Sequence, residues 1–284
     1  MSTISQITID QQGLLMRNES LVEYEMCVSR PSVKIRGASK IRHLLIHKYI
    51  PLKYLLVLLK EQRLIMKPVA TWEDPYENFF LKERFVMEGQ LNNSVYTSVD
   101  NLTRGLYGMS WTLQKETDSL WRIYSPDKLS VMITTKVKCL VEAVSSEDDK
   151  WAVWLGKVKY KTESEVEEWL DKCKAVSSLK QFIDKIGESF FVKRDAFVAE
   201  KEFRVIVNYT DKNQLGSSFI CFPINPSDFL FSYTTDPRLT KYEHAAIKSA
   251  LIDAGAEEGK IKQSSLYSFK PRKVEMRYDP FDDF

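Results

Sequence analysis

Residues 197–207 constrain the fold of this chain most, because apolar and charged side chains alternate along them. Successive side chains of a β-strand point to opposite faces of the sheet. One face of the predicted strand then enters a hydrophobic core with Phe203, Val205 and Val207. The other face, directed toward water or a cleft, carries Glu200, Glu202 and Arg204. This trio is either an ordinary ion pair on a solvated face, which is common and individually weak, or the charged part of a functional site.

The composition predicts a protein with its own hydrophobic core. The chain has 284 residues, of which 44% are hydrophobic and 12% aromatic, which is enough apolar material for one large domain. Its 41 basic and 39 acidic residues leave a net charge of only +2. This balance argues against a histone-like or tail-type nucleic-acid binder. The net charge does not argue against a local basic groove.

Metal and membrane sites find little support in the sequence. The four cysteines are scattered without a Cys-x-x-Cys pair, and only three histidines are present, so no structural zinc site is expected. The first residues lack the basic and apolar regions of a signal peptide. No apolar run approaches the ~20 residues of a membrane-spanning helix. We therefore expect a cytoplasmic protein without a metal cofactor, with reduced cysteines and no membrane partner.

The order of the expected elements is that of an α+β protein. Strands and helices do not alternate regularly, as they would in a series of βαβ units. Helices are predicted over residues 51–63, from about 79 to 85, and over 119–124, 162–169, 178–191 and 240–254. Strands are predicted within residues 41–50 and over 64–66, 106–113, 129–135, 153–160, 197–207, 219–222, 229–233 and 261–267. Two of the helices begin with a capping box, Thr162-x-x-Glu165 and Thr240-x-x-Glu243.

Three parts are expected along the chain. Residues 1–38 are mixed and polar and form an N-terminal extension. Residues 39–270 form a single α+β catalytic-like domain, with a helical insertion at about 162–192. Residues 271–284 form a C-terminal tail.

Four motifs, taken in their order along the chain, resemble a known family. They are His47-Lys48-Tyr49, the segment 72–77 (Trp-Glu-Asp-Pro-Tyr-Glu), Ser110-Trp111 followed by 120–124 (Leu-Trp-Arg-Ile-Tyr), and 200–204 (Glu-Lys-Glu-Phe-Arg). Together they are similar to the prokaryotic domain-of-unknown-function 2971 family, over about residues 41–267. The chain departs from that family at Glu73, where asparagine is usual, and lacks the glycine that usually follows the Trp-x-x-Tyr helix.

The same order of motifs also resembles the ADP-ribosyltransferase superfamily of toxin and phage-defence proteins. This resemblance implies a split β-sandwich with surrounding helices that binds NAD, as a substrate, with three separated elements. It implies Glu202 as the catalytic carboxylate, with Glu200 orienting or deprotonating the acceptor. The other implied or proposed contacts to NAD are His47, Tyr49, Ser110, Trp121, Tyr124 and Arg204.

Two functions from different classes follow from these observations. The first is an NAD-dependent ADP-ribosyltransferase toxin that modifies a macromolecule, with RNA as the preferred acceptor and an antitoxin protein as a partner. The second is a non-catalytic binding or regulatory module, in which Glu200, Glu202 and Arg204 form a structural network. No glycine-rich phosphate loop is present, which argues against a Rossmann dehydrogenase or a P-loop enzyme. Each aromatic and polar candidate has an ordinary structural explanation, such as core packing for Trp121 and Tyr124.

Overall fold

The structure is a computed structural model of the chain. It describes residues 41–72, 74, 77, 79–82, 85–88, 94–97, 105–144, 151–173, 185–209 and 217–276. The predicted N-terminal extension over residues 1–38 lies outside the described residues, as does the whole segment 174–184 of the predicted helical insertion. Within the described residues, no helix combines the length and the apolar character needed to cross a membrane.

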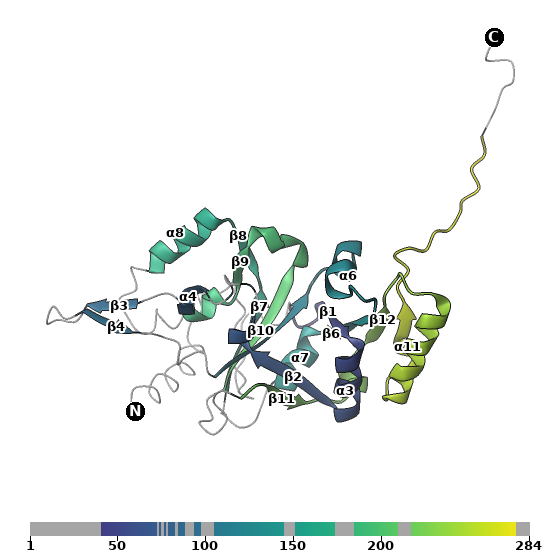
Figure 1. The fold of residues 1–284 in the computed structure, drawn as a ribbon, viewed down its shortest axis with the longest axis horizontal. Helices are drawn as coiled ribbons and strands as arrows, with labels where there is room; N and C mark the ends of the chain where they lie inside the picture. Colours follow the sequence, from purple (N-terminus) through teal and green to yellow (C-terminus); the bar gives the residue numbers. More distant parts are fainter. Residues whose placement is uncertain are drawn as a thin grey trace, which may run out of the picture.

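A large, mostly antiparallel sheet organises the fold (Figure 1). Its main strands, in the order in which they neighbour one another, are β7 (Trp151–Lys157), β10 (Glu202–Tyr209), β5 (Leu106–Thr112), β1 (Leu45–Pro51), β6 (Ser130–Lys136), β12 (Ser232–Thr235) and β13 (Ile261–Gln263). Only β12 and β13 pair in parallel within it. The α+β class is therefore confirmed, whereas the ADP-ribosyltransferase-like split sandwich stays a prediction.

The sheet branches at β5. One edge of β5 pairs with β10 along its whole length. The other edge meets β1 only at Thr112, opposite His47, and meets β2 (Arg63–Pro68) at Gly108 and Tyr107. β2 also pairs with β11 (Ile220–Pro223). The middle of β5, from Met109 to Trp111, therefore pairs with neither β1 nor β2 on this edge.

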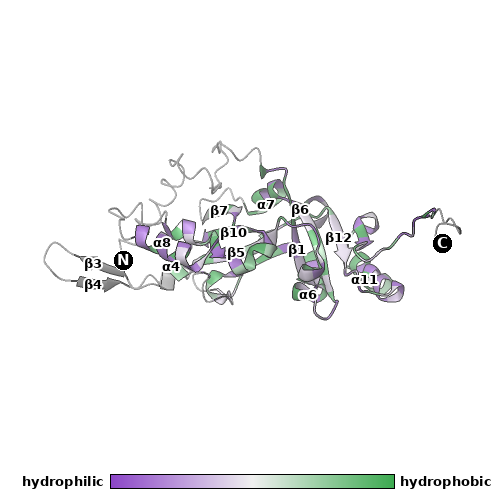
Figure 2. Cartoon of the chain, turned by 90° about the horizontal axis from the view of Figure 1, so that it is seen from above, coloured by the Kyte–Doolittle hydropathy of each residue, from purple (hydrophilic) through white to green (hydrophobic). Residues whose placement is uncertain are grey.

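Three helices cover one face of the sheet and form the larger core with it. They are α3 (Leu52–Glu61), α7 (Val137–Val144) and α11 (Lys241–Asp253). Hydrophobic stretches run through the central strands and α7 (Figure 2). Phe203, Val205 and Val207 are fully buried in this core, as the alternation along residues 197–207 predicted. Pro51 ends β1 and directly precedes α3, so the helix begins one residue later than the predicted 51–63.

A second, smaller core lies against the opposite face of β10. It contains Ile206, Trp154, Phe190 and Trp169, the last from α8 (Glu163–Cys173). Both faces of β10 are therefore buried. Of the two expected surroundings, water or a cleft, water is wrong for Glu202 and Arg204, since Glu202 is 4% and Arg204 0% exposed.

The predicted strand over residues 197–207 is too long at its beginning. Residues Asp195–Glu200 form a 3₁₀ helix, η2, and β10 begins only at Glu202. Lys201 separates them with a φ of 43°, in the left-handed region. Glu200 is thus not a strand residue, contrary to the prediction. The chain turns sharply between the two glutamates, and alternation alone carries no information about such a turn.

Most other predicted elements are present, with shifted ends. Both capping boxes form: Thr162 and Glu165 bond reciprocally before α8, and Thr240 and Glu243 do so before α11. The helix expected to continue to Phe85 is wrong there, because α4 covers Phe79–Lys82 and β3 begins at Phe85. The remaining elements are η1 (Val69–Thr71), β4 (Ser94–Thr97), α6 (Asp118–Tyr124), β8 (Lys159–Lys161), β9 (Val192–Arg194), α10 (Pro226–Phe229) and η3 (Glu258–Lys260).

Candidate active site

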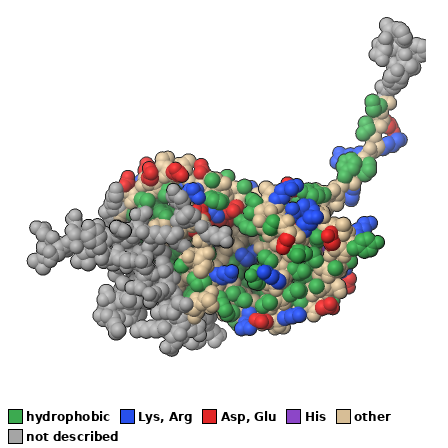
Figure 3. Space-filling view, viewed as in Figure 1, with side chains coloured by type: hydrophobic (Ala, Val, Ile, Leu, Met, Phe, Trp, Pro, Cys, Tyr) green, Lys and Arg blue, Asp and Glu red, His purple; other side chains and the backbone are tan. Residues whose placement is uncertain are grey.

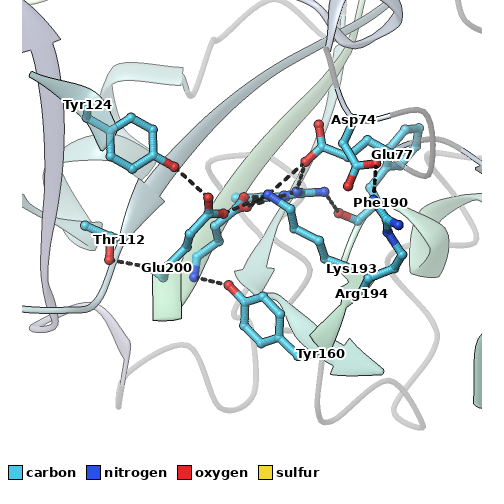
Figure 4. A network of polar contacts seen from close by, with 11 residues as sticks. Asp74, Glu77, Thr112, Tyr124, Tyr160, Phe190, Lys193, Arg194 and Glu200 are labelled. Carbon is cyan, nitrogen blue, oxygen red and sulfur yellow. Dashed lines mark hydrogen bonds and ion pairs between the residues drawn. The ribbon is translucent and has the colours of Figure 1, made fainter. Parts of the chain in front are cut away.

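Lys193 lies at the centre of a cluster of carboxylates beside the start of β10 (Figure 4). Its Nζ atom is 2.6 Å from Oε1 of Glu202 and 2.7 Å from Oε2 of Glu200. It is also 3.4 Å from Oε1 of Glu77. The lysine comes from β9, and its ammonium lies 4.4 Å from the centre of the Phe197 ring on η2. One buried ammonium therefore joins two neighbouring carboxylates, Glu200 and Glu202, to a third, Glu77, that is distant in the sequence.

Arg204 forms the enclosed end of this cluster. Its Nε donates to Oε2 of Glu202 at 2.7 Å, and its Nη1 donates to the backbone carbonyl of Phe190 at 2.9 Å. Nη2 donates to Oε1 of Glu77 and, at 3.2 Å, to Oε1 of Glu202. The ring of Trp72 lies against the guanidinium, with Cζ 4.6 Å from the ring centre. Each of the three guanidinium nitrogens therefore donates to a protein atom.

Gly108 makes room for this arrangement. It faces Ile206 across the pair of strands β5 and β10. A Cβ atom at position 108 would lie 2.5 Å from Cζ2 of Trp72. The absence of a side chain on β5 thus lets Trp72 pack against the sheet and reach Arg204.

The charges of the cluster do not balance. Three carboxylates share two cations, so one negative charge is in excess. Burial alone would raise the pKa of Glu202, but Arg204 and Lys193 outweigh it and hold that pKa well below its usual range. Burial raises the pKa of Glu200, and its contact with Glu202 adds to this effect. Glu202 is therefore the ionised member of the pair, and Glu200 is the member that can hold a proton.

Glu200 forms the outer end of the cluster. Its Oε1 accepts a hydrogen bond from the Tyr124 hydroxyl at 2.9 Å, and Tyr124 is 40% exposed. The Glu200 side chain is 14% exposed, compared with 5% for Glu202. Thr112 donates to the backbone carbonyl of Glu200. Among the glutamates of this cluster, Glu200 is thus the one with the most access to the surface.

Tyr160 fixes the sharp turn between the two glutamates. The backbone N–H of Glu202 donates to its hydroxyl oxygen at 2.7 Å. Burial raises the pKa of Tyr160 to about 12, so the phenol is neutral at physiological pH. A side chain from β8 therefore satisfies the first N–H of β10.

Helix α6 presents two aromatic residues with different surroundings. Tyr124 stacks on Tyr49 of β1, with ring centres 5.7 Å apart and an angle of 18° between the planes. Trp121 meets Tyr49 edge to face at 4.8 Å, is fully buried, and donates from Nε1 to Glu116 at 3.1 Å. Trp121 is thus part of the core, whereas Tyr124 is the exposed ring that a planar ligand can reach.

The end of α6 is held by side chains from two other segments. Nη2 of Arg238 donates to the carbonyls of Trp121, at 3.2 Å, and Ser125. Ser130 donates from its hydroxyl to the carbonyl of Tyr124 at 2.7 Å. These bonds satisfy carbonyls that the end of a helix leaves without partners, and they fix the position of Tyr124.

The register of the strands places the remaining predicted residues. Glu202 lies opposite Thr112, and Thr112 lies opposite His47. The Nδ1 atom of His47 hydrogen-bonds with Thr134 at 2.9 Å. Burial lowers the pKa of His47, with a further contribution from Lys262. His47 and Glu202 therefore lie at the same register position on the two strands that flank β5, with Thr112 between them.

Ser110 lies opposite Arg204, near the end of β5 rather than at its opening. Its backbone carbonyl accepts a hydrogen bond from Nζ of Lys48 at 2.9 Å. Lys48 of β1 thus bonds to the edge of β5 at a position that pairs with neither β1 nor β2. Burial lowers the pKa of Lys48 to about 8, against a smaller opposing effect of Glu202.

Several residues of the cluster were not among the predicted site residues. Glu77 and Asp74 belong to a motif whose simplest explanation was a turn at the start of a helix. Lys193 and Tyr160 stand in segments without any recognised motif. Asp74 pairs with Arg194 at 3.2 Å. The position of Lys193 only seven residues before Glu200 is the one local signal that could have indicated it.

A metal site finds no support in the described part of the chain. No group of three or more His, Cys, Asp or Glu side chains is arranged there to hold a metal ion. The three clustered carboxylates instead bind Lys193 and Arg204.

No protein-family model and no curated protein match the chain, so the resemblance to the domain-of-unknown-function 2971 family is not confirmed. Similar solved structures include DarT from Thermus sp. 2.9 in complex with NAD+, with 8% sequence identity and a TM-score of 0.37. That match covers 80% of this chain and 98% of the other. The complex of the same protein with ADP-ribosylated ssDNA has 9% identity and a TM-score of 0.37, and covers 80% and 96%. TM-scores this low do not establish a common fold.

Proposed function

We propose that this chain is an NAD-dependent ADP-ribosyltransferase that modifies nucleic acid. The observation that carries the proposal is the pair Glu200 and Glu202, which share Lys193 but differ in access to the surface. Glu202 is enclosed by Arg204, and Glu200 reaches the surface beside Tyr124. Two carboxylates with opposite pKa shifts in one site are a common arrangement for acid–base chemistry.

The side chains around Glu200 fit the parts of NAD. The exposed ring of Tyr124, backed by Tyr49, offers a surface on which nicotinamide can stack. A carboxylate beside it suits the ribose hydroxyls. His47 and its basic neighbour Lys262 lie on the same side of the sheet and suit a pyrophosphate.

The reaction needs negative charge near the ribose and a base for the acceptor. The bond between nicotinamide and the ribose C1′ atom breaks as the acceptor attacks C1′, and nicotinamide leaves with the bonding electron pair. Ionised Glu202 favours the positive charge that develops on the ribose only in the transition state. Glu200 then takes the proton of the acceptor. Lys193 keeps both carboxylates in place.

RNA is our first candidate for the acceptor and single-stranded DNA the second. An enzyme that consumes NAD and modifies nucleic acid harms the cell that makes it. We therefore extend the proposal to a toxin in a toxin–antitoxin or phage-defence system, with an antitoxin protein as its inhibitor.

A specific observation also favours the alternative, a non-catalytic binding or regulatory module. Arg204 is fully buried, and all its nitrogens bond to protein atoms. Such a saturated network is compatible with a purely structural role.

Glu200→Gln separates the two functions. Wild-type and variant proteins are incubated with labelled NAD and with RNA, single-stranded DNA or cell protein, and both label transfer and nicotinamide release are measured. Glu188→Gln is the matched control, because Glu188 is 17% exposed and pairs with Lys185 at 2.6 Å. We expect both readouts to be lost in Glu200→Gln and kept in Glu188→Gln.

Glu202→Gln is measured in parallel, with its folding checked by circular dichroism. Loss of transfer in a folded Glu202→Gln supports a direct role of the ionised carboxylate. Absence of nicotinamide release from the folded wild type, with every acceptor, would refute the enzyme and favour the binding module.

A further inference from the structure

Residues 265–276 leave the folded body as an extended segment in which basic side chains stand between aromatic and apolar ones (Figure 1). They form neither a helix nor a strand, and every one of them is exposed. Phe269 is 85% exposed, and Val274 and Met276 are similarly open. The basic residues of the segment are Lys270, Arg272 and Lys273. A segment that displays both rings and cations to solvent offers a surface to a partner.

The segment begins close to the candidate site. The hydroxyl of Tyr267 donates to Asp118, the first residue of α6. The last residue of α6 is Tyr124, which donates to Glu200. A helix of this length spans roughly 10 Å at 1.5 Å per residue. One short, rigid helix therefore joins the base of the segment to the accessible carboxylate.

The surface around this base is also basic. Arg122 on α6 is 63% exposed and pairs with Asp118 at 2.8 Å. Lysine and arginine side chains gather where the segment leaves the body and continue along it (Figure 3). The acidic Glu275 pairs with Lys273 at 2.9 Å, which leaves the segment with an excess of positive charge.

We propose that residues 265–276 and the exposed side of α6 bind single-stranded nucleic acid. Cations attract the phosphates, and rings between them stack on bases, which is how proteins hold single strands without reading a sequence. Pro271 lacks an N–H group and favours an extended backbone, so the segment is poorly suited to pair as a β-strand with a protein. That such a strand is the acceptor modified near Glu200 rests on the proposed function; the binding does not.

Binding is measured by fluorescence anisotropy with the full chain and a labelled single strand of about 12 nucleotides, a length typical of such sites. RNA and DNA of the same sequence are compared over a range of salt concentrations. The test variant replaces Lys270, Arg272 and Lys273 by alanine. The control variant removes the same charge elsewhere, at three exposed lysines: Lys138, Lys157 and Lys172.

We expect the test variant to bind more weakly. The plot of log K against log salt should also become shallower by about 2, because three phosphate contacts on a single strand, at about 0.7 each, are lost. Phe269→Ala is expected to bind on the order of tenfold more weakly with nearly the same slope, because it removes stacking but no charge. The control variant is expected to lose less affinity than the test variant.

Equal affinity and slope in the test and control variants would overturn the binding surface. The same holds if neither RNA nor DNA binds to the folded wild type. Nicotinamide release by the wild type is measured separately. Its absence, together with binding that depends on residues 265–276, would refute the enzyme and leave the binding surface intact.

Discussion

Replacing Arg204 by methionine tests whether the cluster depends on one buried guanidinium. The variant leaves Glu202 and Glu77 with Lys193 as their shared cation, and it leaves the carbonyl of Phe190 without this donor. Removal of one partner from a buried ion pair costs about 3–5 kcal/mol, because the other charge stays buried and uncompensated. Domains have a total stability of roughly 5–15 kcal/mol. We therefore expect a large loss of stability in a protein that can still fold.

The measurement is unfolding by urea, followed by tryptophan fluorescence at neutral pH. Arg122→Met is the matched control, because Arg122 pairs with Asp118 at 2.8 Å but is 63% exposed. An exposed i,i+4 pair contributes only about 0.3–0.5 kcal/mol. Arg204→Lys keeps the charge but not the planar fork, so its loss is expected to lie between the two.

The difference between wild type and Arg204→Met has a predicted pH dependence. The folded-state pKa of Glu202 is lowered in the wild type, so its stabilising contribution is present above the pKa of the unfolded state, about 4.3, and is lost as the pH falls toward the folded-state value. The variant lacks most of this contribution. The loss of stability is thus greatest near neutral pH and shrinks below about pH 5. If Arg204→Met costs less than about 1 kcal/mol at neutral pH, as an exposed pair would, the buried cluster does not stabilise the fold as argued.

Three further substitutions test separate parts of the site. Tyr124→Phe removes the hydrogen bond to Glu200. We expect a stability change of about 1 kcal/mol or less and a kcat for nicotinamide release lowered on the order of tenfold. An unchanged kcat would contradict a role for the phenol. Lys48→Met removes a group whose pKa falls from 10.5 to about 8 on folding. Because the unfolded chain binds this proton more tightly, the stability of the wild type rises with pH between these two values. Urea unfolding below pH 8 and at about pH 10 should show a smaller rise in the variant, and an equal rise would exclude Lys48 as its source. Gly108→Ala forces a Cβ against Trp72 and should cost about 1–3 kcal/mol by the same assay; a neutral result would mean that Trp72 is not held against β5.

Local chemistry was well predicted from the sequence. Thr162 and Thr240 begin helices because the residues three positions later complete a capping box within one turn. Alternation correctly predicted that Phe203, Val205 and Val207 lie in the core. Each of these features depends only on residues close together in the chain.

The strand prediction failed where a local pattern met a tertiary constraint. Lys201 adopts a left-handed conformation that its residue type does not favour. The N–H of Glu202 bonds to Tyr160, 42 positions earlier in the chain. Because no nearby residue announces that contact, the alternating pattern extended the predicted strand across the turn.

The sequence by itself determined which residue types the site contains: the two glutamates, the arginine two positions later and the aromatic residues of α6. Only the tertiary structure decided which of them meet. Lys193 and Glu77 are 116 positions apart in the numbering and lie 3.4 Å from each other in the fold. There, burial raises the pKa of Glu200, whereas Arg204 and Lys193 outweigh burial and lower the pKa of Glu202. Desolvation and partner charges depend on everything that surrounds a carboxylate and not only on its neighbours in the chain.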